Sequence, residues 1–141
     1  MIAERAAEGL RGVDITTGPF PEFATDLQAP TMALMAMASG ASAITETVFE
    51  RRFHHVGELR KLGANISVVG RTALVRGVPR LHGATATCSD VRAAAALVVA
   101  GLSAAGETRL DVLEHLDRGY DGMTEKLAAI GADIVRTDTG G

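Results

Sequence analysis

The sequence has 141 residues, of which 47% are hydrophobic, and its formal net charge is −3 at pH 7. This length and apolar content predict a folded unit with a core of its own. Acidic and basic residues are mixed along the chain, so no basic surface for nucleic acid or anionic lipid is expected. The composition therefore argues against a nucleic-acid partner and against a membrane partner.

The sequence has neither the pattern of a membrane span nor that of secretion. The most apolar run, 93–102, has about half of the roughly 20 residues that cross a bilayer. The N-terminus lacks the charged, apolar and small-residue zones of a signal peptide. Cys88 is the single cysteine and cannot form an intramolecular disulfide. A cytoplasmic location is expected.

Two stretches, 25–68 and 89–135, share one pattern and indicate an internal repeat. They carry the same residue types in the same order, at separations of 64, 66 and 68 residues. The matched pairs are Asp26 and Asp90, Arg52 and Arg118, and Gly63 and Gly131. The slow increase in separation predicts short insertions in loops.

The first copy opens with a helix that we expect to be buried. Thr25 is a suitable N-cap, and the Ala- and Met-rich run after it stops at Gly40. A strand over 43–49 and an amphipathic helix follow. The apolar stripe of that helix is Phe53, Val56, Leu59 and Leu62. Two short strands follow, 66–69 and 73–76, joined by a turn at Gly70-Arg71.

The second copy repeats these elements. Ser89 is the expected N-cap of an apolar helix that stops before Gly106, and 108–113 is the matching strand. A second amphipathic helix follows, with an apolar stripe of Met123, Leu127 and Ile130. A short strand at 134–135 completes the copy. Each copy is therefore predicted to be a β-α-β-α-β-β unit of an α/β fold.

The predicted organisation is one partial α/β domain with two units. The first repeat spans about 13–76, the second repeat spans about 84–136, and 137–141 form a tail. Residues 1–12 look like the remnant of a strand pair or a loop. Because each unit buries only one face against its neighbour, a third unit or another domain is expected to complete the core.

Arg52 and Arg118 occupy the same place in the two repeats, between a strand and a helix. A guanidinium group beside a helix start suits a phosphate or carboxylate ligand. The alternative is a surface ion pair with Glu50 or Asp117, and such pairs are common. The repetition favours an anion site without deciding between the two.

Asp26 and Asp90 lie at the first turns of the two apolar helices. A carboxylate there stabilises the helix dipole, and helix capping is the simpler interpretation. The alternative is a general base beside a core cavity. Arg92 offers a third possibility, a structural ion pair with Asp90.

Other candidate residues have weaker support. His54 and His55 are adjacent and would face different sides of a helix, so no metal site is predicted. Cys88 has no neighbouring base and is expected to be a buried thiol. The segment after Gly40 lacks the spacing of a phosphate-binding glycine loop, so nucleotide hydrolysis is not expected.

Four motifs together resemble the UDP-N-acetylglucosamine 1-carboxyvinyltransferase family of enolpyruvyl transferases, over about residues 12–136. They are PFPEFATDLQAP, ITETVFERRFHHVGELRKLGA, SDVRAAAALVVAGL and HLDRGYDGMTEKLAAIGADI. The resemblance implies an inside-out α/β barrel, with helices inside and sheets outside, in a two-domain enzyme of three units per domain. This chain resembles the C-terminal third.

The resemblance also implies an activity. The family moves the enolpyruvyl group of phosphoenolpyruvate to the 3'-hydroxyl of UDP-N-acetylglucosamine and releases phosphate, the first committed step of peptidoglycan synthesis. No metal or organic cofactor is implied. Asp26 matches the aspartate at the sugar 3'-hydroxyl, the candidate base, and Val48 matches a backbone contact to the sugar nucleotide. Arg52 and Arg118 match arginines at phosphoenolpyruvate, and Asp90 matches an aspartate near the reacting carbons.

Some features depart from the family pattern. Glu22 and Ala24 stand where the family has glycine and proline, so the loop before Asp26 is expected to differ in shape. The family's N-terminal domain has no counterpart here, including its lysine and its mobile loop with cysteine or aspartate, and Cys88 does not match that cysteine. The chain alone is therefore expected to be inactive. The alternatives are a shikimate 3-phosphate enolpyruvyl transferase and a non-catalytic, partner-dependent module.

Overall fold

Six strands and six helical segments form within residues 7–137, the part of the chain that the computed structural model describes. The strands are β1 (Ile15–Thr16), β2 (Ala41–Thr45), β3 (Asn65–Val69), β4 (Thr72–Arg76), β5 (Thr85–Thr87) and β6 (Arg109–Asp111). The helical segments are the 3-10 turn η1 (Thr25–Leu27), α1 (Gln28–Met35), α2 (His55–Lys61), α3 (Val91–Ser103), α4 (Glu114–Gly119) and α5 (Met123–Ala129). Within the described residues, no helix is long and apolar enough to cross a bilayer.

The first repeat folds in the predicted order, and its strands form one sheet. The strand order is β1-β2-β4-β3, with β1 parallel to β2 and the other pairs antiparallel. The predicted strand over 43–49 ends at Thr45, because the N–H groups of Val48 and Phe49 donate to the Glu46 side chain instead of to another strand. The turn between β3 and β4 is confirmed, with Gly70 in the left-handed region at φ 59°.

The second repeat departs from the predicted order after its second strand. Strands β5 and β6 pair in parallel as a two-stranded sheet. An additional short helix, α4, then precedes α5. The predicted strand at 134–135 is wrong, since these residues are in no strand. No second strand follows among the described residues to pair with it, and an unpaired strand leaves its backbone groups without ladder hydrogen bonds.

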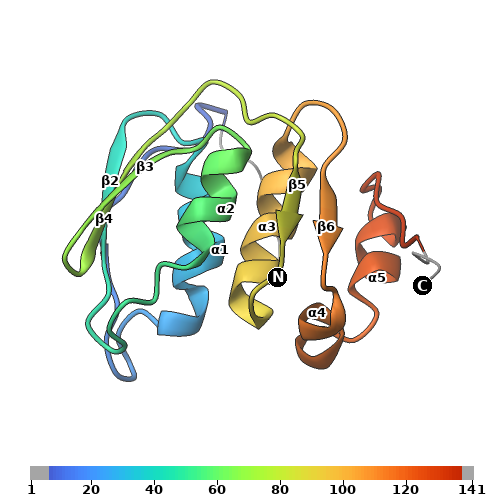
Figure 1. The fold of residues 1–141 in the computed structure, drawn as a ribbon. Coiled ribbons are helices and arrows are strands. Elements are labelled where there is room, and N and C mark those ends of the chain that lie inside the picture. The colour runs from blue at the N-terminus through green and yellow to red at the C-terminus, as the bar shows by residue number, and fades with distance from the viewer. Residues whose placement is uncertain (1–6, 138–141) are drawn as a thin grey trace.

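Helices α1, α2 and α3 lie inside and the sheets outside, as the resemblance implied, whereas α5 lies beyond β6 (Figure 1). Figure 1 shows α1, α2 and α3 between the four-stranded sheet and the pair β5-β6. The largest side chains of this core include Met32, Ile44, Leu59 and Leu97, all fully buried. Met32 and Met35 are buried and Met37 packs against the same core, so the packing role expected for the methionines is confirmed.

The two amphipathic helices are not equally buried. In α2 the predicted stripe is confirmed: Val56, Leu59 and the adjoining Leu62 are buried, and Phe53 packs against them. In α5 no residue is fully buried. Met123 and Leu127 pack against the core, whereas Ile130 is 82% exposed. The prediction that Ile130 belongs to this apolar stripe is therefore wrong.

The two predicted N-caps, Thr25 and Ser89, are both wrong. Thr25 is the first residue of η1 and makes no capping bond, because its hydroxyl is used by Glu46 and Arg52. At the second helix the cap is Asp90, one residue after Ser89. Its longer side chain accepts hydrogen bonds from the N–H groups of two residues in the first turn, which is the usual geometry of an aspartate cap.

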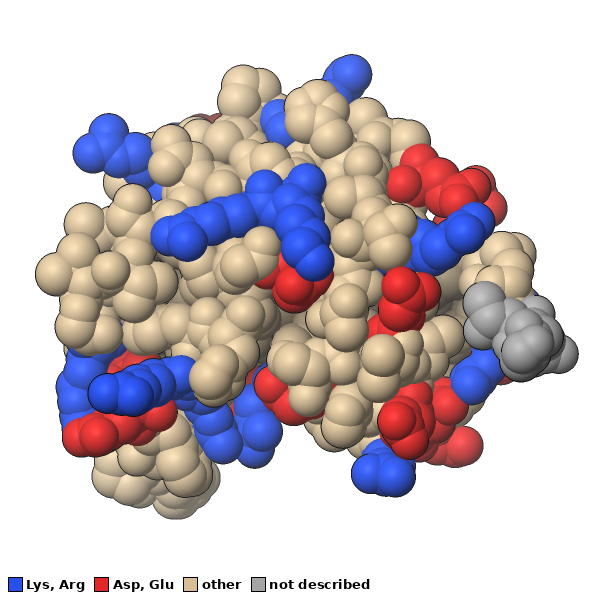
Figure 2. Space-filling model, in the orientation of Figure 1, with Lys and Arg blue, Asp and Glu red and all other residues tan. Residues whose placement is uncertain are grey.

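The chain ends are described only in part. Residues 1–6 and 138–141, including most of the predicted tail, lie outside the described residues. Arg11 forms a parallel β-bridge with Ser39, which agrees with the remnant of a strand pair. On the face in Figure 2, basic and acidic side chains of the described residues are interleaved, as the mixed sequence predicts.

Candidate functional site

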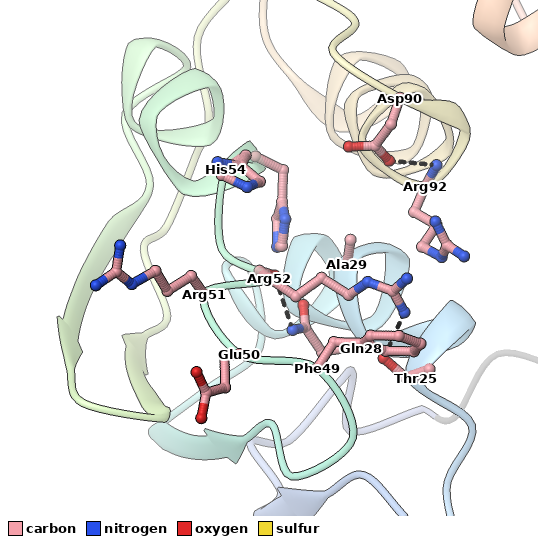
Figure 3. A pocket seen from close by; sticks show the side chains of 11 residues that line it. Thr25, Gln28, Ala29, Phe49, Glu50, Arg51, Arg52, His54, Asp90 and Arg92 are labelled. Carbon is pink, nitrogen blue, oxygen red and sulfur yellow. Dashed lines mark hydrogen bonds between the residues drawn. The ribbon is translucent and has the colours of Figure 1, made fainter.

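A cleft of about 270 Å³ opens where the start of α1, the 49–54 loop and the start of α3 meet (Figure 3). Both repeats therefore contribute to its wall. Arg52 and Asp90 are among the predicted site residues that line it. The remaining lining residues are Thr25, Gln28, Ala29, Phe49, Glu50, Arg51, His54, His55 and Arg92.

Asp26 is an exposed carboxylate held by two guanidinium groups. Its Oδ1 accepts a hydrogen bond from Arg92 Nε at 2.6 Å and lies 3.9 Å from Arg52 Nη1. The Asp26 side chain is 68% exposed, and those of the two arginines are 35% and 23% exposed. Arg52 comes from the first repeat and Arg92 from the second, so this cluster joins the repeats. The expected ion pair of Arg92 is made with Asp26 and not with Asp90.

Arg52 is fixed by three contacts besides Asp26. Its Nη1 donates to Thr25 Oγ1 at 2.9 Å, and its guanidinium carbon lies 3.8 Å from the centre of the Phe49 ring. Its backbone carbonyl accepts from Gln28 Nε2 at 3.1 Å. The predicted alternative, an ion pair of Arg52 with Glu50, is wrong because Glu50 pairs with Arg71 at 2.8 Å. Arg52 is therefore held over the cleft by a neutral hydroxyl and an aromatic face.

Asp90 performs the simpler of its predicted roles. Its Oδ1 accepts from the N–H groups of Arg92 and Ala93 at 2.9 and 3.0 Å, and it thereby caps α3. Burial favours the neutral acid, but these bonds, the Ser89 hydroxyl and the Arg92 charge hold the pKa of Asp90 below its ordinary value. Asp90 lies in the wall of the cleft as an anion.

Arg118 and Val48 are not among the residues that line this cleft. Arg118 lies between β6 and α5, as predicted, but in the last turn of the additional short helix α4, and 72% of its side chain is exposed. Its ion pair is with Glu114 at 3.7 Å rather than with Asp117, which pairs with Arg136. The next residue, Gly119, approaches Val91 so closely that a Cβ there would lie 2.3 Å from Val91 Cγ1. The end of α4 is thus placed beside the start of α3.

Val48 lies in the loop after β2, and 40% of it is exposed. Its backbone N–H donates to Glu46 Oε1 at 2.9 Å. Val48 directly precedes Phe49, which lines the cleft, but does not line it itself.

Two buried polar atoms in the cleft wall have no hydrogen-bond partner. They are Gln28 Oε1 and His55 Nε2. Burial lowers the pKa of His55 to about 4, partly opposed by the charge of Asp90 and reinforced by His54. His55 is therefore neutral at pH 7. No cluster of three or more His, Cys, Asp or Glu side chains suited to a metal occurs among residues 7–137.

Sequence reasoning missed Glu46, the buried acid behind the cleft. It is 1% exposed and continues the inward-facing alternation of β2, after Ser42 and the fully buried Ile44. An acidic residue in phase with a buried strand position was the available signal. Cys88 is 1% exposed, and burial first and the nearby charge of Asp111 next raise the pKa of its thiol to about 11. The expectation of a buried, unreactive thiol agrees with that setting.

The chain resembles proteins of known family over nearly its whole length. The sequence model of the EPSP synthase (3-phosphoshikimate 1-carboxyvinyltransferase) family matches residues 1–127. A UDP-N-acetylglucosamine 1-carboxyvinyltransferase from Gluconobacter oxydans is 55% identical over 132 residues, covering 94% of this chain and 32% of the relative. Another from Rhodospirillum centenum is 59% identical over 127 residues, covering 90% of this chain and 29% of the relative. The chain spans about a third of the length of the curated relatives it matches.

Solved structures agree with the sequence matches. The enolpyruvyl transferase NikO from Streptomyces tendae superposes with a TM-score of 0.81 at 37% identity, over 90% of this chain and 29% of that one. An EPSP synthase from Acinetobacter baumannii has a TM-score of 0.63 at 20% identity, over 82% of this chain and 28% of that one, and shares the fold. Since the family model covers most of the chain and the fold matches, the chain belongs to the EPSP synthase family of enolpyruvyl transferases.

Proposed function

We propose that this chain supplies part of the catalytic site of a UDP-N-acetylglucosamine 1-carboxyvinyltransferase. The reaction moves the enolpyruvyl group of phosphoenolpyruvate to the sugar 3'-hydroxyl, releases phosphate and commits the sugar nucleotide to peptidoglycan synthesis, in the cytoplasm. Support comes from relatives of that name at 55% and 59% identity, against 20% for an EPSP synthase structure. No cofactor takes part in the proposal.

One observation carries the proposal: Asp26, which does not itself line the cleft, is held between Arg52 and Arg92, two residues that do. A carboxylate beside two cations, with 68% of its side chain exposed, is open to an incoming hydroxyl. As the 3'-oxygen attacks C2 of phosphoenolpyruvate, Asp26 accepts the hydroxyl proton. The two guanidinium groups then face the phosphate and carboxylate charges that shift during addition and elimination.

The other predicted site residues take supporting places in this proposal. Arg118 projects from the end of α4 beside the start of α3, and we place it at phosphoenolpyruvate across a cleft between domains. Asp90 fixes the start of α3 and hence the backbone of Arg92. Val48 contacts the sugar nucleotide through its backbone. The rest of the site comes from an N-terminal domain that has no counterpart among these 141 residues.

A chimera tests this proposal. The matching third of the Gluconobacter oxydans relative is replaced by these 141 residues, and phosphate release from phosphoenolpyruvate is measured. We expect release that depends on UDP-N-acetylglucosamine, and none from the 141-residue chain alone, because positioning groups from both domains supply much of the rate.

The acceptor decides between the two family activities. Shikimate 3-phosphate replaces UDP-N-acetylglucosamine in a parallel assay of the same chimera. Turnover with shikimate 3-phosphate and not with the sugar nucleotide would reverse the assignment. A folded chimera without activity toward either acceptor would contradict the proposed function.

A further inference from the structure

Glu46 is a buried carboxylate whose two oxygens receive five hydrogen bonds. Oε1 accepts from Thr17 Oγ1 at 2.7 Å and from the N–H groups of Val48 and Phe49 at 2.9 and 3.2 Å. Oε2 accepts from Thr25 Oγ1 at 2.9 Å and Gln28 Nε2 at 3.2 Å. Every donor is a neutral group. The charge is therefore stabilised by fixed dipoles.

This arrangement keeps Glu46 ionised although it is buried. Burial alone favours the neutral acid, but the hydroxyls of Thr17 and Thr25 and the two backbone N–H groups outweigh it and lower the pKa of Glu46. Burying a charge costs stability unless hydrogen bonds offset the lost hydration, and these five bonds provide that compensation.

Three of the donors lead to Arg52. Thr25 Oγ1 donates to Glu46 and accepts from Arg52 Nη1 at 2.9 Å. Gln28 Nε2 is shared between Glu46 and the Arg52 carbonyl. Phe49 donates its N–H to Glu46 and places its ring 3.8 Å from the Arg52 guanidinium carbon. Through these three donors, Glu46 fixes the guanidinium group of Arg52, its backbone carbonyl and the Phe49 ring on which it stacks.

Thr25 also connects this network to the proposed base. It immediately precedes Asp26, whose carboxylate lies 3.9 Å from the same Arg52 Nη1. Fixing Thr25 therefore fixes both members of that contact. Ile44 in β2, two residues before Glu46, is fully buried by apolar packing and needs no such network.

We infer that Glu46 is a positioning residue, which acts through Thr25, Gln28 and Phe49 to orient Arg52 and Asp26 toward the anionic substrate. It touches neither substrate in this scheme. The inference deepens the proposed function and rests on it for its catalytic consequence. Its structural consequence, the fixed position of Arg52 over Phe49, is independent of any reaction.

Thr25 offers the sharpest test because its hydroxyl joins Glu46 to Arg52. In the chimera, Thr25→Val removes the hydroxyl at nearly constant shape. We expect the KM for phosphoenolpyruvate to rise about tenfold, with a smaller fall in kcat, because two hydrogen bonds to charged groups, Glu46 and Arg52, are lost. Thr25→Ser, which keeps the hydroxyl, should restore the parent values.

The matched control is Thr72→Val. Thr72 donates or accepts one hydroxyl bond with Thr45 at 3.0 Å in the sheet of the first repeat. This bond involves none of the residues that link Glu46 to Arg52, so KM should stay at the parent value. A rise in KM for this variant equal to that for Thr25→Val would reduce the effect to general destabilisation and overturn the inference.

A second measurement does not depend on activity. In NMR spectra of the 141-residue chain, stacking on Phe49 should shift the Arg52 side-chain protons upfield. Thr25→Val and Glu46→Gln should move these resonances toward their unstacked positions, and Thr25→Ser and Thr72→Val should not. Unchanged Arg52 resonances in the first two variants would overturn the inference, whereas an inactive parent chimera with the expected resonance changes would contradict only the proposed function.

Discussion

Glu46 and His55 are buried close to the same cleft and meet the cost of burial in opposite ways. Glu46 remains charged because five donors surround it. His55 has an unpartnered Nε2, and burial lowers its pKa to about 4. One residue thus gains hydrogen bonds and keeps its charge, and the other gives up its charge.

The neutral state of His55 predicts acid sensitivity. The unfolded histidine takes up a proton near pH 6.5 and the folded one near pH 4, so stability is fully present above 6.5 and is lost as the pH falls between these values. The difference amounts to on the order of 3 kcal/mol of unfolding free energy.

Urea unfolding of the 141-residue chain between pH 7 and pH 4.5 measures this effect. His55→Asn should flatten the dependence, because the group no longer titrates. His54→Asn, at an exposed neighbouring position, should change the dependence much less, because His54 is the smallest of the three influences on the pKa of His55. Equal slopes for the parent and His55→Asn would refute the assignment.

Some site residues could be predicted from the sequence and others could not. Arg52 was found because it recurs at an equivalent position in the second repeat, and it does line the cleft. The short helix α4 that carries Arg118 was not predicted, because it has no apolar stripe: its only buried residue is Leu116. Arg92 was assigned the wrong partner, since its contact with Asp26 exists only after α1 and α3 pack together.

At the scale of elements, glycines mark where the predicted helices stop. Gly40 and Gly106, and likewise Gly63 and Gly131, occupy matching places in the repeats, and all four have positive φ between 86° and 98°. A side chain there would be strained. Gly63 and Gly131 directly follow the C-caps of α2 and α5, whereas α1 and α3 end at Met35 and Ser103, before Gly40 and Gly106. The strand at 134–135 failed because pairing partners, which composition does not reveal, decide whether a strand forms.

Two glycines without positive φ predict opposite effects of alanine. Gly57 lies within α2, is exposed and has nothing within 4 Å of an added Cβ. Gly57→Ala should raise the free energy of unfolding by about 0.5–1 kcal/mol, because alanine loses less entropy in a helix. A Cβ on Gly77 would lie 1.5 Å from the Ala38 carbonyl oxygen. Gly77→Ala should lower the free energy of unfolding by about 2 kcal/mol or more.

Chemical denaturation of both variants beside the parent chain checks this pair. The midpoints should move in opposite directions at similar slopes. A Gly77→Ala variant as stable as the parent would show that the connection after β4 is not packed against Ala38 in solution.

At the scale of the whole molecule, the cleft exists because the two repeats pack through α1 and α3. Asp26 joins one arginine from each repeat, Arg52 from the first and Arg92 from the second. The internal repeat in the sequence predicted two similar units. It could not predict that the paired carboxylate and arginine would come from different units.

The central claim is that Asp26 accepts the sugar hydroxyl proton, and kcat of the Asp26→Asn chimera at saturating substrates tests it most directly. Asparagine keeps an oxygen for Arg92 but accepts protons poorly, so the site should retain its shape. We predict a fall in kcat of about 100-fold or more, the usual loss for a general base. A kcat within about threefold of the parent would show that Asp26 does not act as the base.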